Sequence, residues 1–375
     1  MRLQWVELDR FRNLQRQKVL LHPRFNLLLG PNGQGKTNFL EAVGYLGTLR
    51  SFRAAGRNEM IRSGDSMCRV SGEVVSGNLV KNLAFTLNRK GRVQFMDNQK
   101  IPSPESYLQA FKIVHFIPED VNLVSGSPSW RRKVVDRSVF EVVPEYVTEY
   151  RRYLAALRHR NALLRGRRAS EDEMTGWNRT LADAGSVLVR RRVELLLAVN
   201  PGMMELGQKL GLGTGLHLNY TSSFCSDPGV LGKTGSGDIR DLLLASLARE
   251  SEREKRAGHT LVGPHRDGIQ FHIGEPGASV DLARYGSQGQ KRSAVLAFKM
   301  SLAGELARVR GEWPLVILDD VASELDDERR MALGDMVRRT EAQFFISTTG
   351  QEYMFLPAGE GMIWKVNDGL LEPFS

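Results

Sequence analysis

The segment GPNGQGKT follows the apolar run FNLLL and matches the pattern G-x-x-x-x-G-K-[ST] in full. Its residues are Gly30, Pro31, Asn32, Gly33, Gln34, Gly35, Lys36 and Thr37. The glycines let successive backbone N–H groups turn towards a phosphate, and Lys36 adds a cation. Thr37 supplies a hydroxyl for Mg²⁺, and the helix expected directly after it points its positive end at the same place. The segment therefore predicts a site for the phosphates of ATP and for Mg²⁺.

Two successive carboxylates follow a second apolar run, in the segment PLVILDD. A buried strand over residues 315–318 would deliver both acids at its C-terminal edge. There Asp319 would hold Mg²⁺ through its water shell, and Asp320 would polarise the attacking water as a general base. An aspartate is one methylene shorter than a glutamate, so we expect slow hydrolysis. Two acids that merely cap a loop are the structural alternative.

The segment RYGSQGQKRS contains the pattern S-x-G-Q in Ser287, Gly289 and Gln290, directly before an expected helix. A helix N-terminus with small residues is a second receptor for phosphate. One triphosphate rarely needs two receptors within one chain. We therefore expect this one to contact the γ-phosphate of an ATP held by a second copy, so that ATP joins two protomers.

Short apolar runs and turn residues predict the elements that position these motifs. Alternation over residues 83–101, interrupted by NRKG and DNQK, predicts an antiparallel meander. The runs FNLLL, KIVHFI, PLVILDD and AQFFIST read as strands, the last two typical of a parallel sheet. The motif order, which closes with SELD at residues 323–326, is that of ATP-binding-cassette proteins.

After Pro144 the spacing of apolar residues becomes helical. Tyr146, Tyr150 and Tyr153 fall on one stripe, and Trp177 and Leu181 begin a second. The charged segment RGRRASEDEMTG separates them, so we expect two antiparallel helices that form an arm. The fold class is therefore α/β: a cassette-type ATPase head with an antiparallel layer and an inserted helical lobe. The expected division is 1–140 for the first ATPase part, 141–210 for the arm, and 211–375 for the second ATPase part.

The composition indicates a globular protein with an anionic partner. The 375 residues carry 52 Lys and Arg against 43 Asp and Glu, a net charge of +9. This charge favours nucleic acid or an acidic membrane surface, and solubility alone is the plain alternative. Cys68 and Cys225 lie far apart without metal-binding spacing, which fits a reducing cytoplasm. No run approaches the ~18 apolar residues of a membrane span, and no export signal is recognised.

Several stretches resemble the RecF family of bacterial recombination mediators, which is related to the Rad50 and SMC head domains. They are FRNL at 11–14, FIPEDVNLVSGSPSWRRKVVDR at 116–137, HTLVGPHRDGIQF at 259–271, YGSQGQKR at 285–292 and ILDDVASELDDERR at 317–330. The resemblance runs nearly end to end. It implies an ATP-dependent homodimer that binds gapped DNA or junctions of single- and double-stranded DNA, works with RecR, promotes RecA loading, and is released by hydrolysis.

Carried over residue by residue, the resemblance implies that Lys36 and Thr37 bind phosphate and magnesium, that Asp319 orders the metal, and that Asp320 is the base. Ser287 would contact the ATP of the partner. The chain departs from the cassette pattern at two places. Glu119 and Asp120 stand where other cassette proteins have glutamine, and Thr348 and Thr349 stand where many have a histidine.

Basic residues outside the nucleotide motifs are the candidates for DNA contact, since Lys and Arg on adjacent helical turns can follow phosphates. The candidates are Arg131, Arg132, Lys133, Arg151, Arg152 and Arg190, with Arg158, Arg160, Arg191 and Arg192 nearby. A solvated helix face is the alternative for each of them.

Two other residues keep two interpretations. Arg12 either reaches the triphosphate, as the resemblance suggests, or lies exposed on an edge strand. His265, in GPHRDG, either contacts nucleotide or couples two lobes, or belongs to a tight turn. For the whole chain, the alternative function is the ATPase subunit of a membrane transporter, which shares the ordered motifs but would lack this helical insertion.

Overall fold

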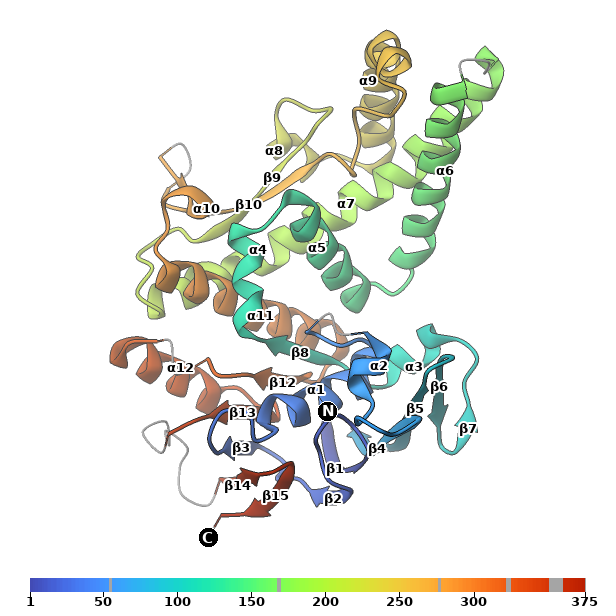
Figure 1. Cartoon of the computed structure of the whole chain (residues 1–375). Coiled ribbons are helices and arrows are strands. Elements are labelled where there is room, and N and C mark those ends of the chain that lie inside the picture. The colour runs from blue at the N-terminus through green and yellow to red at the C-terminus, as the bar shows by residue number, and fades with distance from the viewer. Residues whose placement is uncertain (54–55, 167–169, 276–277, 322–324, 351–359, 375) are drawn as a thin grey trace. The chain divides into compact units, whose positions relative to one another are not determined.

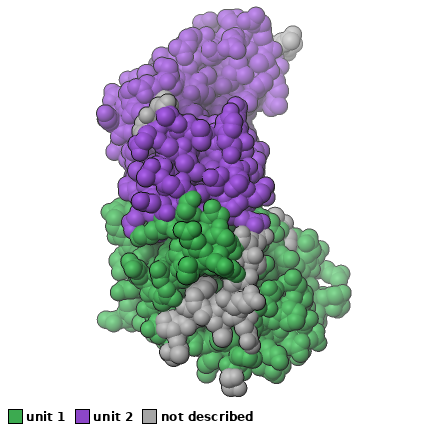
Figure 2. Space-filling model, turned by 90° about the vertical axis from the view of Figure 1, so that its left-hand side faces the viewer, with its two compact units in different colours: residues 1–120, 209–211, 295–375 green, residues 121–208, 212–294 purple. Residues whose placement is uncertain are grey.

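A computed structural model describes residues 1–53, 56–166, 170–275, 278–321, 325–350 and 360–374. The chain divides into two compact units, coloured separately in Figure 2. Unit 1 comprises residues 1–120, 209–211 and 295–375, and unit 2 comprises residues 121–208 and 212–294.

The first sheet of unit 1 is antiparallel and has the strand order β2-β1-β4-β5-β6-β7 (Figure 1). Its strands are β1 (Arg2–Asp9), β2 (Gln17–Leu20), β4 (Met67–Ser76), β5 (Leu79–Asn88), β6 (Arg92–Met96) and β7 (Gln99–Lys100). Side chains along β4 alternate between buried and more exposed positions, as expected where one face of a sheet covers a core. The predicted meander over residues 83–101 is confirmed by β5, β6 and β7.

The second sheet of unit 1 has the strand order β15-β14-β3-β13-β12-β8, with β8, β12, β13, β3 and β14 mutually parallel. Its strands are β3 (Phe25–Leu29), β8 (Ile113–Phe116), β12 (Leu315–Leu318), β13 (Phe344–Thr348), β14 (Gly361–Asn367) and β15 (Leu370–Pro373). Every residue of β3, β12 and β13 is buried, which explains why β12 is wholly apolar and why β3 and β13 are mostly apolar. The polar residues in them are Asn26 of β3 and Ser347 and Thr348 at the end of β13. The hairpin β14–β15 was not anticipated from the sequence.

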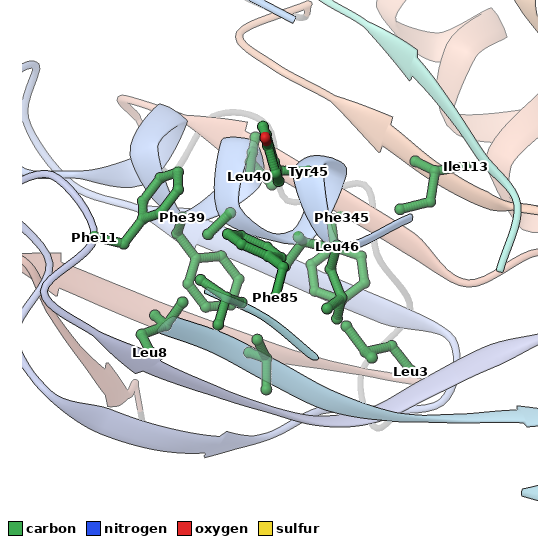
Figure 3. Close-up of a cluster of buried hydrophobic side chains, with 14 of the residues drawn as sticks. Leu3, Leu8, Phe11, Phe39, Leu40, Tyr45, Leu46, Phe85, Ile113 and Phe345 are labelled. Atoms are coloured by element: carbon green, nitrogen blue, oxygen red, sulfur yellow. The ribbon is translucent and has the colours of Figure 1, made fainter. Parts of the chain in front are cut away.

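Helix α1 (Lys36–Thr48) lies between the two sheets and is the centre of the main core. Figure 3 shows Phe39, Leu40, Tyr45 and Leu46 of this helix among side chains from both sheets. The Tyr45 ring lies 4.5 Å from that of Phe85, and the Phe39 ring 6.3 Å from that of Phe345. Burial on both sides fixes the helix, and thereby the position of its N-terminus at Lys36. Unit 1 also contains α2 (Arg57–Met60), α3 (Pro104–Ala110) and α12 (Asp327–Arg339).

Unit 2 is mainly helical (Figure 1). Its elements are α4 (Asn122–Ser125), α5 (Pro128–Val142), α6 (Tyr146–Gly166), α7 (Glu171–Lys209), α8 (Pro228–Leu231), α9 (Ser236–Ala257) and α10 (Leu282–Tyr285), with the small sheet β11-β10-β9 of Val280–Asp281, Gly268–Ile273 and His217–Thr221. The predicted pair of arm helices is confirmed by α6 and α7. The His159 ring stacks on Trp177 at 4.7 Å, and a Cβ on Gly185 would lie 3.1 Å from the Tyr153 ring, which shows that the two helices run antiparallel. The boundary between the units falls within α11 (Gln288–Arg310).

The units differ from the division expected at 1–140, 141–210 and 211–375. The helical unit already begins at Val121 and, apart from residues 209–211, extends to Ala294, so it includes α5, the small sheet and the S-x-G-Q segment. The reason is tertiary packing. Helix α5 packs against β10, and Arg132 donates a hydrogen bond of 2.9 Å to the carbonyl of Asp267. Contacts between segments that are distant in sequence produce no local periodicity, so they cannot be predicted from hydrophobic spacing.

None of the helices in the described ranges combines the length and apolar character needed to cross a bilayer.

Candidate nucleotide-binding site

The loop Gly30–Gly35 connects β3 to α1, as the motif predicts, and its three glycines have positive φ angles. They are Gly30 at 156°, Gly33 at 82° and Gly35 at 117°. A Cβ on Gly30 would lie 2.5 Å from the carbonyl oxygen of Val366, so this position admits only glycine without rearrangement. The loop therefore has its shape before any ligand is considered.

Lys36 closes this loop from inside. Its Nζ donates to the carbonyls of Gly30 at 2.6 Å and of Pro31 at 2.9 Å. Burial lowers the pKa of Lys36, while the carboxylates of Asp320 and Asp319 oppose that shift. An ammonium has three N–H donors, so one remains for a phosphate oxygen while both loop bonds persist.

Thr37 and Asp319 meet at the carboxyl edge of the parallel sheet. Thr37 Oγ1 donates to Asp319 Oδ1 at 3.1 Å, and Ser347 Oγ donates to the same oxygen at 2.6 Å. Burial raises the pKa of the Asp319 carboxyl, and the two hydrogen bonds act in the opposite direction. Hydroxyl and carboxylate oxygens are the donors that Mg²⁺ prefers, with substrate phosphates and waters completing its octahedron. The donor set fits Mg²⁺.

Asp320 turns away from the strand because its backbone has a φ of 50°. Its N–H donates to Ser347 Oγ at 2.9 Å, so one serine orients both acids. Ser347 was missed from the sequence. The available signal was its position near the end of the apolar run FFIST, where the carboxyl ends of neighbouring parallel strands meet.

Arg12 also lines the nucleotide pocket, and it pairs with Glu41, which was not predicted from the sequence. Its guanidinium forms two hydrogen bonds with the fully buried carboxylate of Glu41, one of them at 3.0 Å. Ser51 donates to the same carboxylate, and the Arg12 N–H donates to the Met60 carbonyl at 2.9 Å. The exposed edge-strand interpretation of Arg12 is therefore wrong for this structure.

One pocket of about 340 Å³ collects most of these residues. It is lined by Arg12, Asn32, Gly33, Gly35, Lys36, Thr37, Asn38, Arg53, Asp319, Asp320 and Ser347. Asn38 and Arg53 were also missed, and they are paired with each other through a hydrogen bond of 2.9 Å. The cations Arg12, Lys36 and Arg53 and the oxygen groups of Thr37, Asp319 and Asp320 give the pocket the chemistry of a magnesium–triphosphate site.

Comparison with known proteins agrees with this site. Residues 2–363 match the family described as the RecF/RecN/SMC N terminal domain. The DNA replication and repair protein RecF of Geotalea daltonii is 33% identical over 352 residues, covering 93% of each chain. The protein of that name from Anaeromyxobacter sp. is 33% identical over 374 residues, covering 100% of this chain and 99% of its own. The chain belongs to the RecF family.

Solved structures of RecF have the same fold. A structure of the recombination mediator protein RecF with ATP superposes with a TM-score of 0.85 at 29% identity, covering 99% of both chains. A second RecF structure, with ATPrS, gives a TM-score of 0.83 and covers 100% of this chain and 98% of that one. The Smc head domain of Pyrococcus furiosus gives 0.58 at 14% identity, which shows a shared head fold and no more.

The S-x-G-Q segment of this RecF-family chain belongs to unit 2, whereas the pocket belongs to unit 1. Ser287 is exposed at the start of α11 and forms a reciprocal cap with Gln290. The Gln290 N–H donates to Ser287 Oγ at 3.2 Å, and the Ser287 N–H donates to Gln290 Oε1 at 2.8 Å. Gly289 follows within the first turn. These two bonds cap the N-terminus of the helix, which lies at the surface. In the SELD segment, Ser323 and Glu324 lie outside the described residues.

The two departures from the cassette pattern have structural explanations. Asp120 is buried, forms an ion pair of 3.1 Å with Lys299 and accepts the Ile117 N–H, so it fixes the chain after β8. Thr348 is buried at the end of β13, with its hydroxyl within 3.4 Å of the Gly350 backbone. Within the described residues, the hydroxyl of that strand that contacts Asp319 belongs to Ser347.

The basic residues expected to contact DNA fall into buried, half-buried and exposed groups, and the three buried ones require correction. Arg131 is buried and donates to the carbonyls of Val124 and Gly126, while Arg160 and Arg192 form buried ion pairs with Glu254 and Asp136. A guanidinium carries five donors, so it satisfies carbonyls and carboxylates inside a helical unit. Arg132 is half-buried, and its guanidinium donates a hydrogen bond to the Asp267 carbonyl. The exposed candidates are Lys133, Arg151, Arg152, Arg158 and Arg190, and Arg191 is half-buried.

His265 holds the arm within unit 2. Its Nδ1 lies 2.6 Å from the Tyr153 hydroxyl of α6, and its Nε2 lies 3.3 Å from the Thr260 carbonyl. Burial lowers the pKa of His265 to about 4, so the ring is neutral at pH 7. Both ring nitrogens are engaged inside the unit, which favours a packing role over contact with nucleotide.

Proposed function

We propose that this chain is an ATP-switched DNA-binding protein of recombinational repair. Two copies would close as a clamp at gapped DNA or at junctions between single- and double-stranded DNA. The observation that carries the proposal is the convergence of Lys36, Thr37 and Asp319 on one pocket, together with an exposed S-x-G-Q helix start that one chain does not need for itself. Membership of the RecF family supports this interpretation over a transporter subunit.

Within the pocket, the chain binds and orients the triphosphate. Backbone N–H groups of Gly33 and Gly35 surround the phosphates, and Lys36 contributes its remaining donor. Thr37 and Asp319 hold Mg²⁺, which neutralises charge on the phosphate oxygens when it is bound. Arg12, fixed by Glu41, adds a second cation at the wall of the pocket.

Asp320 acts as the general base that orients the attacking water. Its backbone is held in the left-handed conformation, and its N–H donates to Ser347, which sets the direction in which the short side chain leaves the strand. Because the carboxylate reaches one methylene less far than a glutamate would, hydrolysis is slow, with a turnover below ~10 per second, the level typical of efficient enzymes. Such an ATPase serves as a timer that releases DNA.

The second copy supplies Ser287, Gly289 and Gln290 to the γ-phosphate. This role would account for the exposure of the helix start, where Ser287 and Gln290 cap each other within the chain. Replacing Ser287 with Arg would block ATP-dependent dimerisation and leave ATP binding to the monomer intact. Unchanged dimers in light scattering would contradict the composite site.

DNA binding rests on the net charge of +9 and on the exposed cations, which are Lys133, Arg151, Arg152, Arg158 and Arg190. Phosphate contacts of this kind carry no sequence information, so recognition depends on the shape of the DNA. The related solved structures are described as a recombination mediator in the RecFOR pathway. We accordingly propose RecR as the partner of this chain, and promotion of RecA loading as its output.

The deciding experiment is DNA-binding anisotropy with the Asp320→Asn protein, comparing gapped with blunt duplex, with and without ATP, at two salt concentrations. Binding that requires ATP, favours the gap and weakens with salt is the expected result. DNA binding that ignores ATP, or no DNA binding at all, would leave the ATPase fold standing and remove the repair function.

A further inference from the structure

The turn of the C-terminal hairpin, Asn367–Leu370, contacts the phosphate-binding loop through the backbone and side chain of one residue. The Asp368 N–H donates to Gln34 Oε1 at 2.8 Å, and the Gly369 N–H donates to the Gln34 carbonyl at 2.9 Å. The two segments are 334 residues apart in sequence. Gln34 was expected to bind nucleotide, yet it is not among the described residues that line the pocket, although Gly33 and Gly35 on either side are.

A third segment, which follows Arg12, completes the junction. The Gln15 N–H donates to the Gly369 carbonyl at 3.0 Å, and Gln17 Nε2 donates to the same carbonyl at 2.7 Å. Gln15 Nε2 also donates to the Asp368 carbonyl at 3.0 Å. The turn therefore joins the loop that carries Lys36 to the loop that carries Arg12.

Space at this junction is fully used. A Cβ on Gly369, whose φ is 74°, would lie 2.2 Å from the Asn13 carbonyl oxygen. A Cβ on Gly35 would lie 3.4 Å from the Gly369 Cα and 3.3 Å from Asn13 Oδ1. Main chains that approach this closely cannot shift independently, so displacement of the turn must displace Gln34 or Asn13.

We propose that the turn Asn367–Leu370 is a positioning element of the nucleotide site, with Gln34 and Gly369 as its positioning residues. The inference rests on the proposed binding of ATP to this pocket. A loop with glycines at 30, 33 and 35 has many backbone conformations, and ordering it on ligand binding would weaken affinity. The turn holds the loop in one conformation in the folded chain, so binding requires less ordering.

The test compares two glycines that have the same backbone strain. Gly369 and Gly311 both have a φ of 74°, but a Cβ on Gly311 meets nothing within 4 Å. Gly369→Ala should raise the Kd for ATP at least tenfold, with kcat at saturating ATP changed less than twofold. Gly311→Ala should leave the Kd unchanged. Equal Kd values for both variants and the wild type would overturn the proposal.

A second pair of variants removes the side-chain contact and avoids backbone strain. Gln34→Met keeps the size of the side chain but loses the acceptor for the Asp368 N–H, and should raise the KM for ATP about threefold to tenfold. Gln99→Met makes the same chemical change on the exposed edge strand β7 and should have no effect. An unchanged KM in Gln34→Met would contradict the role of Gln34.

Hydrogen exchange distinguishes a specific effect of the turn on the nucleotide site from a general loss of stability of the variants. Because coupling between two sites is reciprocal, ATP should slow exchange at the amides of Asp368 and Gly369 in the wild type, and less so in Gln34→Met. A wild type that binds no ATP would refute the proposed function itself. A wild type that binds ATP without protecting these amides would refute only the role of the turn.

Discussion

Thr37 donates a hydrogen bond of 3.1 Å to Asp319 across a separation of 282 residues. The contact joins the first turn of α1 to the end of β12, at the edge where the carboxyl ends of the parallel strands meet. Ligands of open α/β sheets bind at such an edge, because helix N-termini and strand ends converge there. Ser347 donates to the same carboxylate from β13, so three elements define one oxygen cluster.

Replacing Asp319 with Asn should separate stability from activity. The amide oxygen can still accept from Thr37 and Ser347, but the negative charge that Mg²⁺ needs is gone. Hydrolysis should fall by about 100-fold or more, since even outer partners of metal ligands are worth 10–100-fold. Steady-state phosphate release with varied Mg²⁺ measures this change.

The same variant should be more stable than the wild type in the absence of ligand. Burial raises the pKa of the Asp319 carboxyl, so the folded chain holds this proton at a higher pH than the unfolded chain does. Wild-type stability therefore decreases as pH rises above the ordinary value of 3.8, whereas the amide does not titrate. Thermal unfolding at pH 7 should show a higher Tm for Asp319→Asn, and a difference that shrinks near pH 4. A lower Tm at pH 7 would contradict this account.

Arg192→Leu should destabilise unit 2 strongly. Arg192 binds the buried Asp136 through two hydrogen bonds of 2.7 and 2.9 Å and also donates to the Pro264 carbonyl. Loss of one partner leaves a buried charge, at a cost of about 3–5 kcal/mol. Urea unfolding measures the change in unfolding free energy.

The neighbouring Arg191 is the control, because its pair with Glu194 is solvent-exposed and contributes about 0–1 kcal/mol. Adding Asp136→Leu to Arg192→Leu should recover part of the lost stability. A double variant less stable than Arg192→Leu would show that the buried charge was not the cause.

Lys133→Ala should weaken DNA binding and reduce its dependence on salt. Lys133 is exposed on α5, and each phosphate contact to duplex DNA contributes about 0.9 to the slope of log K against log salt. Anisotropy titrations at several salt concentrations give this slope. Lys100→Ala removes the same charge from β7, and an equal effect there would indicate net charge alone.

His265 should make stability fall in mild acid. The unfolded imidazole takes up a proton below about pH 6.5, whereas burial lowers the folded pKa to about 4. The unfolding free energy should therefore decrease as pH drops from about 6.5 towards 4, by up to about 3 kcal/mol for this group. His265→Asn should remove that part of the slope while the other histidines keep theirs. A slope identical to the wild type would show that folding does not change the pKa of this ring.

Local patterns were enough for the chemical centre of the site. The phosphate loop from Gly30 to Thr37 is one short segment and the two acids are adjacent in a second one, so the chemistry of each segment is set by residue type and local spacing. Strands such as β3 and β13 could also be predicted, because burial on both faces makes most of their residues apolar. The helices of the arm could be predicted because one stripe of each is buried, which gives the apolar residues a helical spacing.

Only the fold determined which charged residues are exposed and which form buried ion pairs. Arg12 with Glu41, Arg192 with Asp136 and Asp120 with Lys299 are separated in sequence, and single residues of this kind show no period. The basic cluster Arg190, Arg191 and Arg192 illustrates the limit. Three identical side chains in a row lie on different faces of α7, so two form ion pairs on the surface and one is buried.

The sequence by itself determined the phosphate loop, the acidic strand end, the S-x-G-Q helix start and the type of most elements, because each depends on neighbours within one or two turns. Only the tertiary structure decided that Ser347 orients both acids, that Gln34 faces the C-terminal turn, and that α5 belongs with β10. These relationships join segments up to 334 residues apart. Contacts between segments so far apart depend on the packing of the whole core. A local sequence pattern contains no information about that packing.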